Sequence, residues 1–189
     1  MVEAAELEFR ASGYAGTSMC SVARRAGVST KTLYRLIPTK AELFREVISR
    51  RIGGFVRASA VDARDQAGLR EALTRLLTAY GELTLSKETV AAYGLVLAEC
   101  RRFPELGRLF LDETSRGTGE AMTSWLLRHQ KLGLLRLRDA ALAAGMLRGM
   151  MAMDPQRAVI LGQRSPLDHG EIAERASACA MLFLDGCCG

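Results

Sequence analysis

The sequence predicts an all-helical fold. No convincing run of alternating β-branched residues, the mark of a half-buried strand, is found along its 189 residues. The four prolines all stand where a helix could begin or end, as Pro38 does, because the residue before a proline avoids helical geometry. Capping boxes also stand before two apolar stretches, at Thr39 with Glu42 and at Asp168 with Glu171. Helices joined by short loops are therefore expected along the whole chain.

These boundaries place each helix in turn. The expected helices span Val2–Ser12, Ser18–Ala26, Thr30–Ile37, Lys40–Ala60, Leu69–Leu85, Lys87–Phe103, Pro104–Lys131, Asp139–Met153, Pro155–Leu161 and His169–Gly186. A separate helix is expected to begin at Asp154 and Pro155, because proline is favoured at the first helical position.

Length and hydropathy limit the class of protein. The chain is long enough for one medium domain, or for a small module fused to a larger one. The longest apolar segment, Ala140–Met153, is shorter than the ~20 residues of a membrane span and carries Arg148. The N-terminus begins with acidic residues and lacks the basic start and apolar block of a secretory signal. We therefore expect a cytoplasmic protein with no membrane partner.

The excess positive charge is confined to the first third of the chain. Residues 1–60 hold 10 Lys and Arg against 5 Asp and Glu, whereas residues 61–189 hold 16 of each. A local basic excess is the electrostatic footprint of a nucleic-acid or anionic-membrane partner, although ordinary surface charge could also account for it.

Cysteine and histidine usage argues against a disulfide framework or a metal site. The five cysteines form no CxxC pair, and Cys187 and Cys188 at the chain end are expected to be inert thiols. His129 and His169 are far apart in sequence and are expected at the surface. No P-loop, GxGxxG, HExxH or GxSxG motif occurs. The sequence thus predicts no enzyme, no metal and no cofactor.

Two short helices on either side of Gly27, Val28 and Ser29 form a helix-turn-helix pattern. Gly27 can adopt the left-handed geometry that ends the first helix. Ser29 can cap the second helix, and Val28 can fill the gap between the two. The apolar residues of the pattern point inward; they are Val22, Ala23, Ala26, Val28 and Leu33.

The second helix leaves its polar residues facing out. About eight residues of helix span roughly 12 Å, which matches the ~12 Å width of the DNA major groove. The exposed N–H groups that open the preceding helix favour a phosphate, and Lys40 can bind another as a point charge. The candidate DNA-binding residues are Thr17, Ser18, Ser29, Thr30, Lys31, Thr32, Tyr34, Arg35 and Lys40.

Residues 4–47 closely resemble the DNA-binding domain of the TetR/AcrR family of transcription regulators. The resemblance rests on AGVS at Ala26–Ser29, TLY at Thr32–Tyr34 and PxKxxL at Pro38–Leu43. It implies that the third helix reads the major groove while Thr17, Tyr34 and Lys40 hold phosphates. The sequence departs from the family pattern at Leu36 and Ile37, where a polar and an aromatic residue are common.

The resemblance also implies a domain organisation and partners. A helix-turn-helix domain is expected at residues 1–47, and a helical effector-binding and dimerisation domain at residues 48–189. The implied function is a ligand-responsive regulator, usually a repressor, that binds a palindromic operator as a homodimer. The alternative is a helical small-molecule-binding or interaction protein that has lost DNA binding.

Two sets of residues are candidates for sites in the second domain. Apolar and adaptable side chains could line an effector pocket, although such residues at helical spacing are more often core. This set is Tyr80, Tyr93, Phe103, Met122, Trp125, Met146 and Met150. Small residues on the last two long helices could form a four-helix dimer interface, or an ordinary intrachain core. This second set is Ala144, Ile172, Ala176, Cys179 and Phe183.

Overall fold

A computed structural model describes residues 1–60 and 62–187, without the side chains of Ala58 and Cys187. These residues form helices and loops and no strand, which confirms the all-helical prediction. The helices are α1 (Val2–Gly16), α2 (Met19–Arg25), α3 (Thr30–Leu36), α4 (Lys40–Ala58), α5 (Gln66–Thr84), α6 (Lys87–Glu99), α7 (Pro104–Thr114), a π-helical segment η1 (Ser115–Gly119), α8 (Glu120–Lys131), α9 (Ala140–Ile160) and α10 (His169–Cys187). The expectation for Cys187 and Cys188 lies outside the described side chains.

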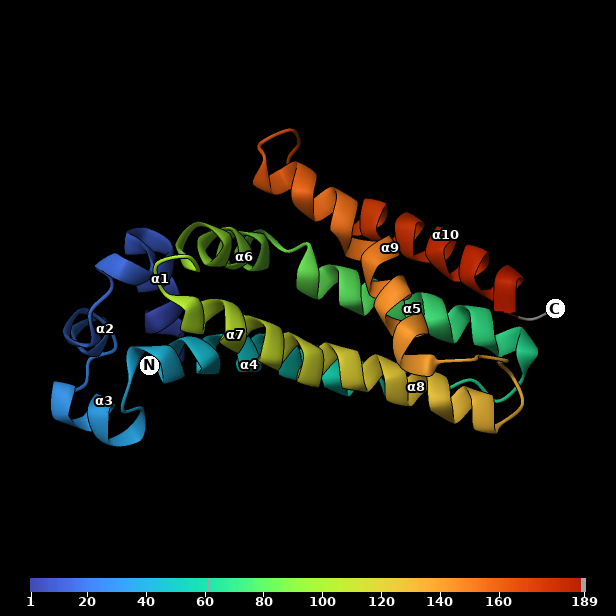
Figure 1. Cartoon of the computed structure of the whole chain (residues 1–189), viewed down its shortest axis with the longest axis horizontal. Helices are drawn as coiled ribbons and strands as arrows, with labels where there is room; N and C mark the ends of the chain where they lie inside the picture. The colour runs from blue at the N-terminus through green and yellow to red at the C-terminus, as the bar shows by residue number, and fades with distance from the viewer. Residues whose placement is uncertain (61, 188–189) are drawn as a thin grey trace. The chain divides into compact units, whose positions relative to one another are not determined.

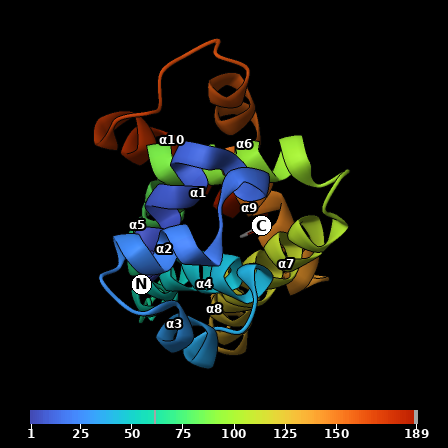
Figure 2. The same cartoon turned by 90° about the vertical axis from the view of Figure 1, so that its left-hand side faces the viewer.

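The chain divides into two compact units. Unit 1 combines Met1–Arg51 with Ala91–Thr114, and unit 2 combines Ile52–Val90 with Ser115–Gly189. Within unit 1, α3 lies at the edge that is remote from α6 (Figures 1 and 2). The functional domain boundaries expected at residues 1–47 and 48–189 stay a prediction. No described helix is long and apolar enough to cross a membrane.

An aromatic cluster forms part of the core of unit 1. The ring of Tyr14 stacks on Phe9 at 5.7 Å and meets Phe44 edge-on at 6.0 Å. Phe103 belongs to the second segment of unit 1, directly before α7, and its ring meets that of Tyr14 edge-on at 5.2 Å. Such edge-to-face pairs are favoured by the ring quadrupoles. Residues 91–114 therefore share a core with the first 51 residues.

The core of unit 2 joins α5, α8, α9 and α10. In Figure 1, α10 lies along α5 and α9. Gly81 of α5 permits this packing, because a Cβ at that position would lie 2.7 Å from both Ile172 and Met151. Trp125 of α8 is fully buried and its ring lies 3.8 Å from that of His129. The close approach of four helices buries most of their apolar residues.

Two expectations about individual residues are wrong. Helix α9 does not end before Pro155 but runs through it to Ile160, and Pro155 is buried. His129 is fully buried rather than exposed, because Ala63 N–H donates to its Nε2 at 2.9 Å while its Nδ1 meets Trp125 O at 2.8 Å. A buried polar ring is tolerated when both nitrogens are paired. The exposed position expected for His169 is confirmed.

Candidate nucleic-acid interface

The turn between α2 and α3 has the local geometry that its sequence predicts. Gly27 adopts a left-handed φ of 69° after α2. Ser29 Oγ accepts from Thr32 N–H at 3.0 Å and caps α3. Leu33 and Val22 are fully buried between the helices, so α3 is anchored by its inner face. Ile37 is extended at φ −137°, as the position before Pro38 requires, and α3 therefore ends at Leu36.

The outer face of α3 carries exposed long side chains. Lys31, Tyr34 and Arg35 are exposed and, at spacings of three and four residues, share one face of the helix. Thr30 and Thr32 are half-buried, and the hydroxyls of Thr32 and Ser29 lie 2.8 Å apart. The structure thus brings six of the candidate residues together on α3 and its N-cap. Leu36 is 55% exposed at the end of the same helix.

Ser18 occupies the start of α2, where its side chain caps the helix. Its Oγ accepts from Ser21 N–H at 3.0 Å, and the side chain of Ser21 accepts from Ser18 N–H in return. This reciprocal pairing is a capping box. Ser18 remains exposed and stays a candidate DNA contact.

Thr17 and Lys40 have structural partners within unit 1, and phosphate binding by these two side chains stays a prediction. Thr17 is buried, and its hydroxyl donates to Gly13 O at 2.7 Å. Lys40 Nζ donates to Tyr14 O at 2.7 Å and to Thr17 O at 3.0 Å, and lies over the Tyr14 ring. Burial lowers the pKa of Lys40, while the charges of Glu99 and Glu105 oppose that shift. Both side chains therefore hold the α1–α2 turn in place.

Glu99, at the end of α6, holds the same turn from the other side. Its carboxylate accepts from Tyr14 N–H at 2.8 Å and from Ala15 N–H at 3.0 Å. These N–H groups follow a kink in α1 at Gly13, where φ is 68°. A Cβ on Gly13 would lie 2.8 Å from Glu99 Oε1. Glu99 could not be predicted from the sequence, because a partner 85 residues away leaves no local signal.

The candidate ligand residues are divided between the two units. Tyr93 and Phe103 belong to unit 1, where Tyr93 stacks on Phe110 at 5.3 Å. Tyr80, Met122 and Trp125 are buried in the core of unit 2, with Met150 packed against that core, whereas Met146 is 58% exposed. Ligand contact by these residues stays a prediction.

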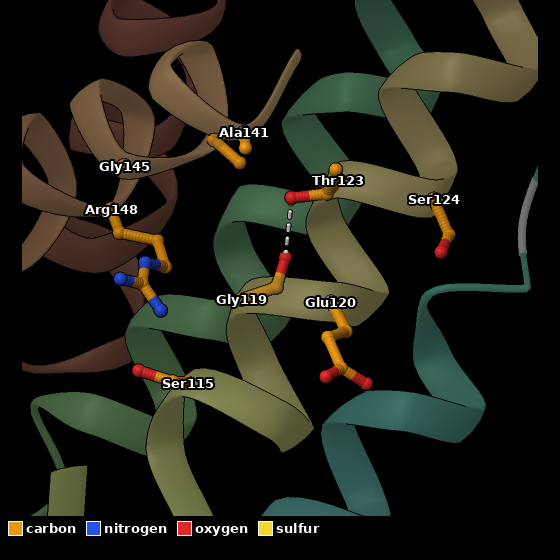
Figure 3. A pocket seen from close by; sticks show the side chains of 9 residues that line it. Ser115, Gly119, Glu120, Thr123, Ser124, Ala141, Gly145 and Arg148 are labelled. Carbon is orange, nitrogen blue, oxygen red and sulfur yellow. Dashed lines mark hydrogen bonds between the residues drawn. The ribbon is translucent and has the colours of Figure 1, made fainter. Parts of the chain in front are cut away.

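An open cavity of about 570 Å³ lies at the surface of unit 2, between η1 with α8 on one side and α9 on the other (Figure 3). Its walls carry small and hydroxyl side chains together with one cation and one anion. The lining residues are Ser115, Gly119, Glu120, Thr123, Ser124, Ala141, Ala144, Gly145 and Arg148. None of the seven candidate ligand residues lines this cavity.

The candidate dimer residues are mostly buried within one chain, and their place in a dimer interface stays a prediction. Ala144, Ile172, Ala176 and Cys179 are at most 6% exposed because α10 packs along α5 and α9, and Phe183 packs against the same core. This burial within one chain is what the alternative left open by the sequence, an intrachain core, predicts.

Family models match both parts of the chain. Residues 1–47 match "Bacterial regulatory proteins, tetR family", and residues 71–186 match "AefR-like transcriptional repressor, C-terminal domain". The chain belongs to the TetR family. It is thus a transcription regulator with an N-terminal DNA-binding helix-turn-helix, as the resemblance in the sequence predicts.

Solved structures of TetR family members share the fold. The Flavonoid-responsive Regulator FrrA is 28% identical with a TM-score of 0.77, over 98% of this chain and 94% of that one. A regulator from Pseudomonas syringae pv. tomato str. DC3000 is 25% identical with a TM-score of 0.72, over 98% and 94%. FadR from Bacillus subtilis in complex with stearoyl-CoA, at 16% identity and TM-score 0.71 over 98% and 96%, is alike in fold alone. No curated protein matches the sequence.

Proposed function

We propose that this TetR family member binds a palindromic operator as a homodimer and that a small organic effector releases it from DNA. In this proposal α3 of each subunit enters the major groove. Lys31 contacts base edges near the start of the helix, while Tyr34 and Arg35 donate to phosphates. Ser18, Ser29, Thr30 and Thr32 are further contacts at the starts of α2 and α3. A regulator of this kind acts in the cytoplasm and catalyses no reaction.

The outward face of α3 carries this proposal. Its cationic and phenolic side chains project from a helix whose inner residue, Leu33, is fully buried, so the presented face has a fixed orientation. A helix held in this way can insert as a rigid body, which is how helix-turn-helix proteins read DNA. The basic excess of residues 1–60 supplies long-range attraction to the duplex.

A dimer surface is proposed on the outward faces of α9 and α10. Leu142, Met146 and Met153 repeat at helical spacing on α9 and are 57–65% exposed. Met181 and Leu182 of α10 are 44% and 63% exposed. Large apolar side chains exposed together on two packed helices mark an interaction surface. Because dimers are typical of the family, the proposed occupant is a second copy of this chain.

The effector response is proposed from the same family context. FrrA is named for its response to flavonoids, and FadR is seen with stearoyl-CoA. For this chain, an effector that binds one spacing of the two α3 helices better than another would shift the population away from the DNA-bound form. Repression relieved by the effector is the expected outcome.

Selection of bound sequences from random duplex DNA tests the proposal. We expect an inverted repeat whose half-sites lie about 34–36 Å apart, one turn of B-DNA, or a multiple of it. Affinity for the selected site should fall steeply as salt rises, because counterions are released on binding. Light scattering on the DNA-free protein should give the mass of a dimer. A monomer that shows no preference among duplexes at low salt would instead favour a helical protein that has lost DNA binding.

A further inference from the structure

Arg148 is the one charged residue in the apolar stretch Ala140–Met153 of α9, and its charge is poorly compensated. Nη1 donates to Thr118 Oγ1 at a long 3.4 Å, and Nε is buried with no hydrogen-bond partner among the described residues. Within that part of the chain no carboxylate forms an ion pair with this guanidinium. A buried donor left without a partner costs free energy, so an acceptor supplied from outside would be favoured.

The guanidinium borders the cavity of unit 2 and is held there by the shape of η1. Figure 3 shows Arg148 reaching from α9 toward Ser115 and Gly119. A Cβ on Gly119 would lie 3.0 Å from Arg148 Nη1, so the glycine lets the guanidinium lie close against the helix. On the other side of η1, a Cβ on Gly117 would lie 2.1 Å from Ile52 Cγ2. Both glycines therefore have a packing role. π-Helical segments are rare and occur frequently at functional sites.

The rest of the lining restricts what could occupy the cavity. Its volume of about 570 Å³ falls within the range of about 300–1,000 Å³ that is usual for small-molecule sites. Ser115, Thr123 and Ser124 add hydroxyl groups, and Ala141 and Gly145 leave space. Glu120 lines the cavity too, but its carboxylate points away from Arg148 in Figure 3. A second negative charge on the ligand would be repelled by Glu120.

We propose that this cavity is the effector site and that it takes a small organic monoanion whose carboxylate group pairs with Arg148. Arg suits this role because its planar fork of donors matches two oxygens of such a group. The hydroxyl-bearing residues accept and donate hydrogen bonds to the remainder of the ligand. This inference rests on the proposed ligand response and names the effector class and the residue that selects it.

The position of the site in the chain connects it with DNA binding. The cavity wall Ser115–Gly119 directly follows α7 of unit 1. In α7, Glu113 accepts from Ser49 of α4 at 2.7 Å, and only three residues separate the end of α3 from the start of α4. A ligand that reorders η1 therefore acts on the residue next to α7. This gives the effector a covalent path to the unit that carries α3.

Calorimetric titration of the DNA-free dimer with paired acids and amides tests the site. The probes are acetate, hexanoate, decanoate, benzoate and salicylate, each compared with its neutral amide. We expect at least one acid to bind at least tenfold more tightly than its amide, and Arg148→Met to remove that difference. Arg136→Met, which removes an exposed arginine of unit 2, is the matched control and should keep it.

Two glycine substitutions on α9 distinguish a filled cavity from an unfolded variant. A Cβ at Gly145 or Gly149 meets nothing within 4 Å, but only Gly145 lines the cavity. Gly145→Leu should therefore abolish binding of the acid, while Gly149→Leu on the same helix should retain it. The proposal is overturned if no acid exceeds its amide in the wild type, or if Arg148→Met or Gly145→Leu keeps the difference. Operator binding measured in the absence of any acid or amide tests the proposed function independently of the effector site.

Discussion

Arg175 of α10 supplies hydrogen bonds to the stretch of α9 that Pro155 leaves incomplete. Proline has no N–H, so the carbonyl of Met151, four residues earlier, lacks its helical partner. Arg175 Nε donates to that oxygen at 2.9 Å, and Nη2 donates to Met150 O at 2.6 Å. The helix therefore continues through a proline at which the sequence alone predicts a new helix.

Replacing Arg175 should destabilise the protein in a way that depends on Pro155. Arg175→Met leaves the Met151 carbonyl unpaired, and we expect a loss of about 1–3 kcal/mol in the free energy of unfolding. In a Pro155→Ala background the restored N–H satisfies the carbonyl, so the same substitution should cost less. Urea denaturation of the four proteins measures this coupling. Equal losses in both backgrounds would show that Arg175 acts independently of the proline.

Removing the charge of Glu99 should weaken both the fold of unit 1 and DNA binding. In Glu99→Gln one carboxylate oxygen becomes an amide donor, which cannot accept from Tyr14 or Ala15 N–H. We expect a loss of about 1–3 kcal/mol of stability and weaker binding to the selected operator. Glu105→Gln, a nearby carboxylate in α7, is the control. Unchanged operator affinity in Glu99→Gln would show that the α1–α2 turn does not set the position of α3.

Lys31 and Lys40 should differ in how their loss affects operator binding. Lys31→Ala is expected to relax sequence choice at one base pair and to cost about 1–3 kcal/mol there. Lys40→Ala removes two bonds to the carbonyls of Tyr14 and Thr17, so it should lower thermal stability as well as affinity. Binding to a library of single-base operator variants, together with melting curves, separates the two effects. A uniform loss across all variants in Lys31→Ala would contradict base readout by this residue.

Alkaline pH should destabilise the protein partly through Tyr80. Burial raises the pKa of the Tyr80 phenol above its usual value of about 10, although the nearby charge of Arg148 opposes the shift. The unfolded state therefore ionises first, so stability is complete below about pH 10 and declines as pH rises toward the pKa of the folded state. In Tyr80→Phe the free energy of unfolding should fall less steeply above pH 10. Tyr34→Phe, at a 49% exposed position, should follow the wild type.

The helix-turn-helix could be predicted from the sequence because its determinants are local. Gly27, Ser29 and Leu33 act on neighbours within a few residues, by ending a helix, capping the next and anchoring it. The reciprocal bonds of Asp168 and Glu171 at the start of α10 follow from the same short-range rules. For such residues, the number of positions between two partners along the chain is enough to predict that they are in contact.

The roles of Thr17, Lys40 and the α10 stripe could not be predicted in this way. Polar residues before a helix fit either a phosphate contact or an internal cap, and only the placement of the Gly13, Tyr14 and Thr17 carbonyls decides between them. Small residues on α10 fit either a second subunit or α5 of the same chain. The spacing of apolar residues along a helix predicts which face is buried, but it does not predict whether the same chain or a second subunit covers that face.

By itself, the sequence determined that the chain is helical, where α3 begins and ends, and which family it belongs to, because capping, turn geometry and motif spacing act over a few residues. The tertiary structure decided that Glu99 and Lys40 hold the turn before α2, that Arg175 completes α9 at Pro155, and that Arg148 borders a cavity. Those relationships join residues that are 23 to 85 positions apart, or depend on the space between two helices. Sequence patterns that span a few residues cannot predict contacts between residues so far apart in the chain.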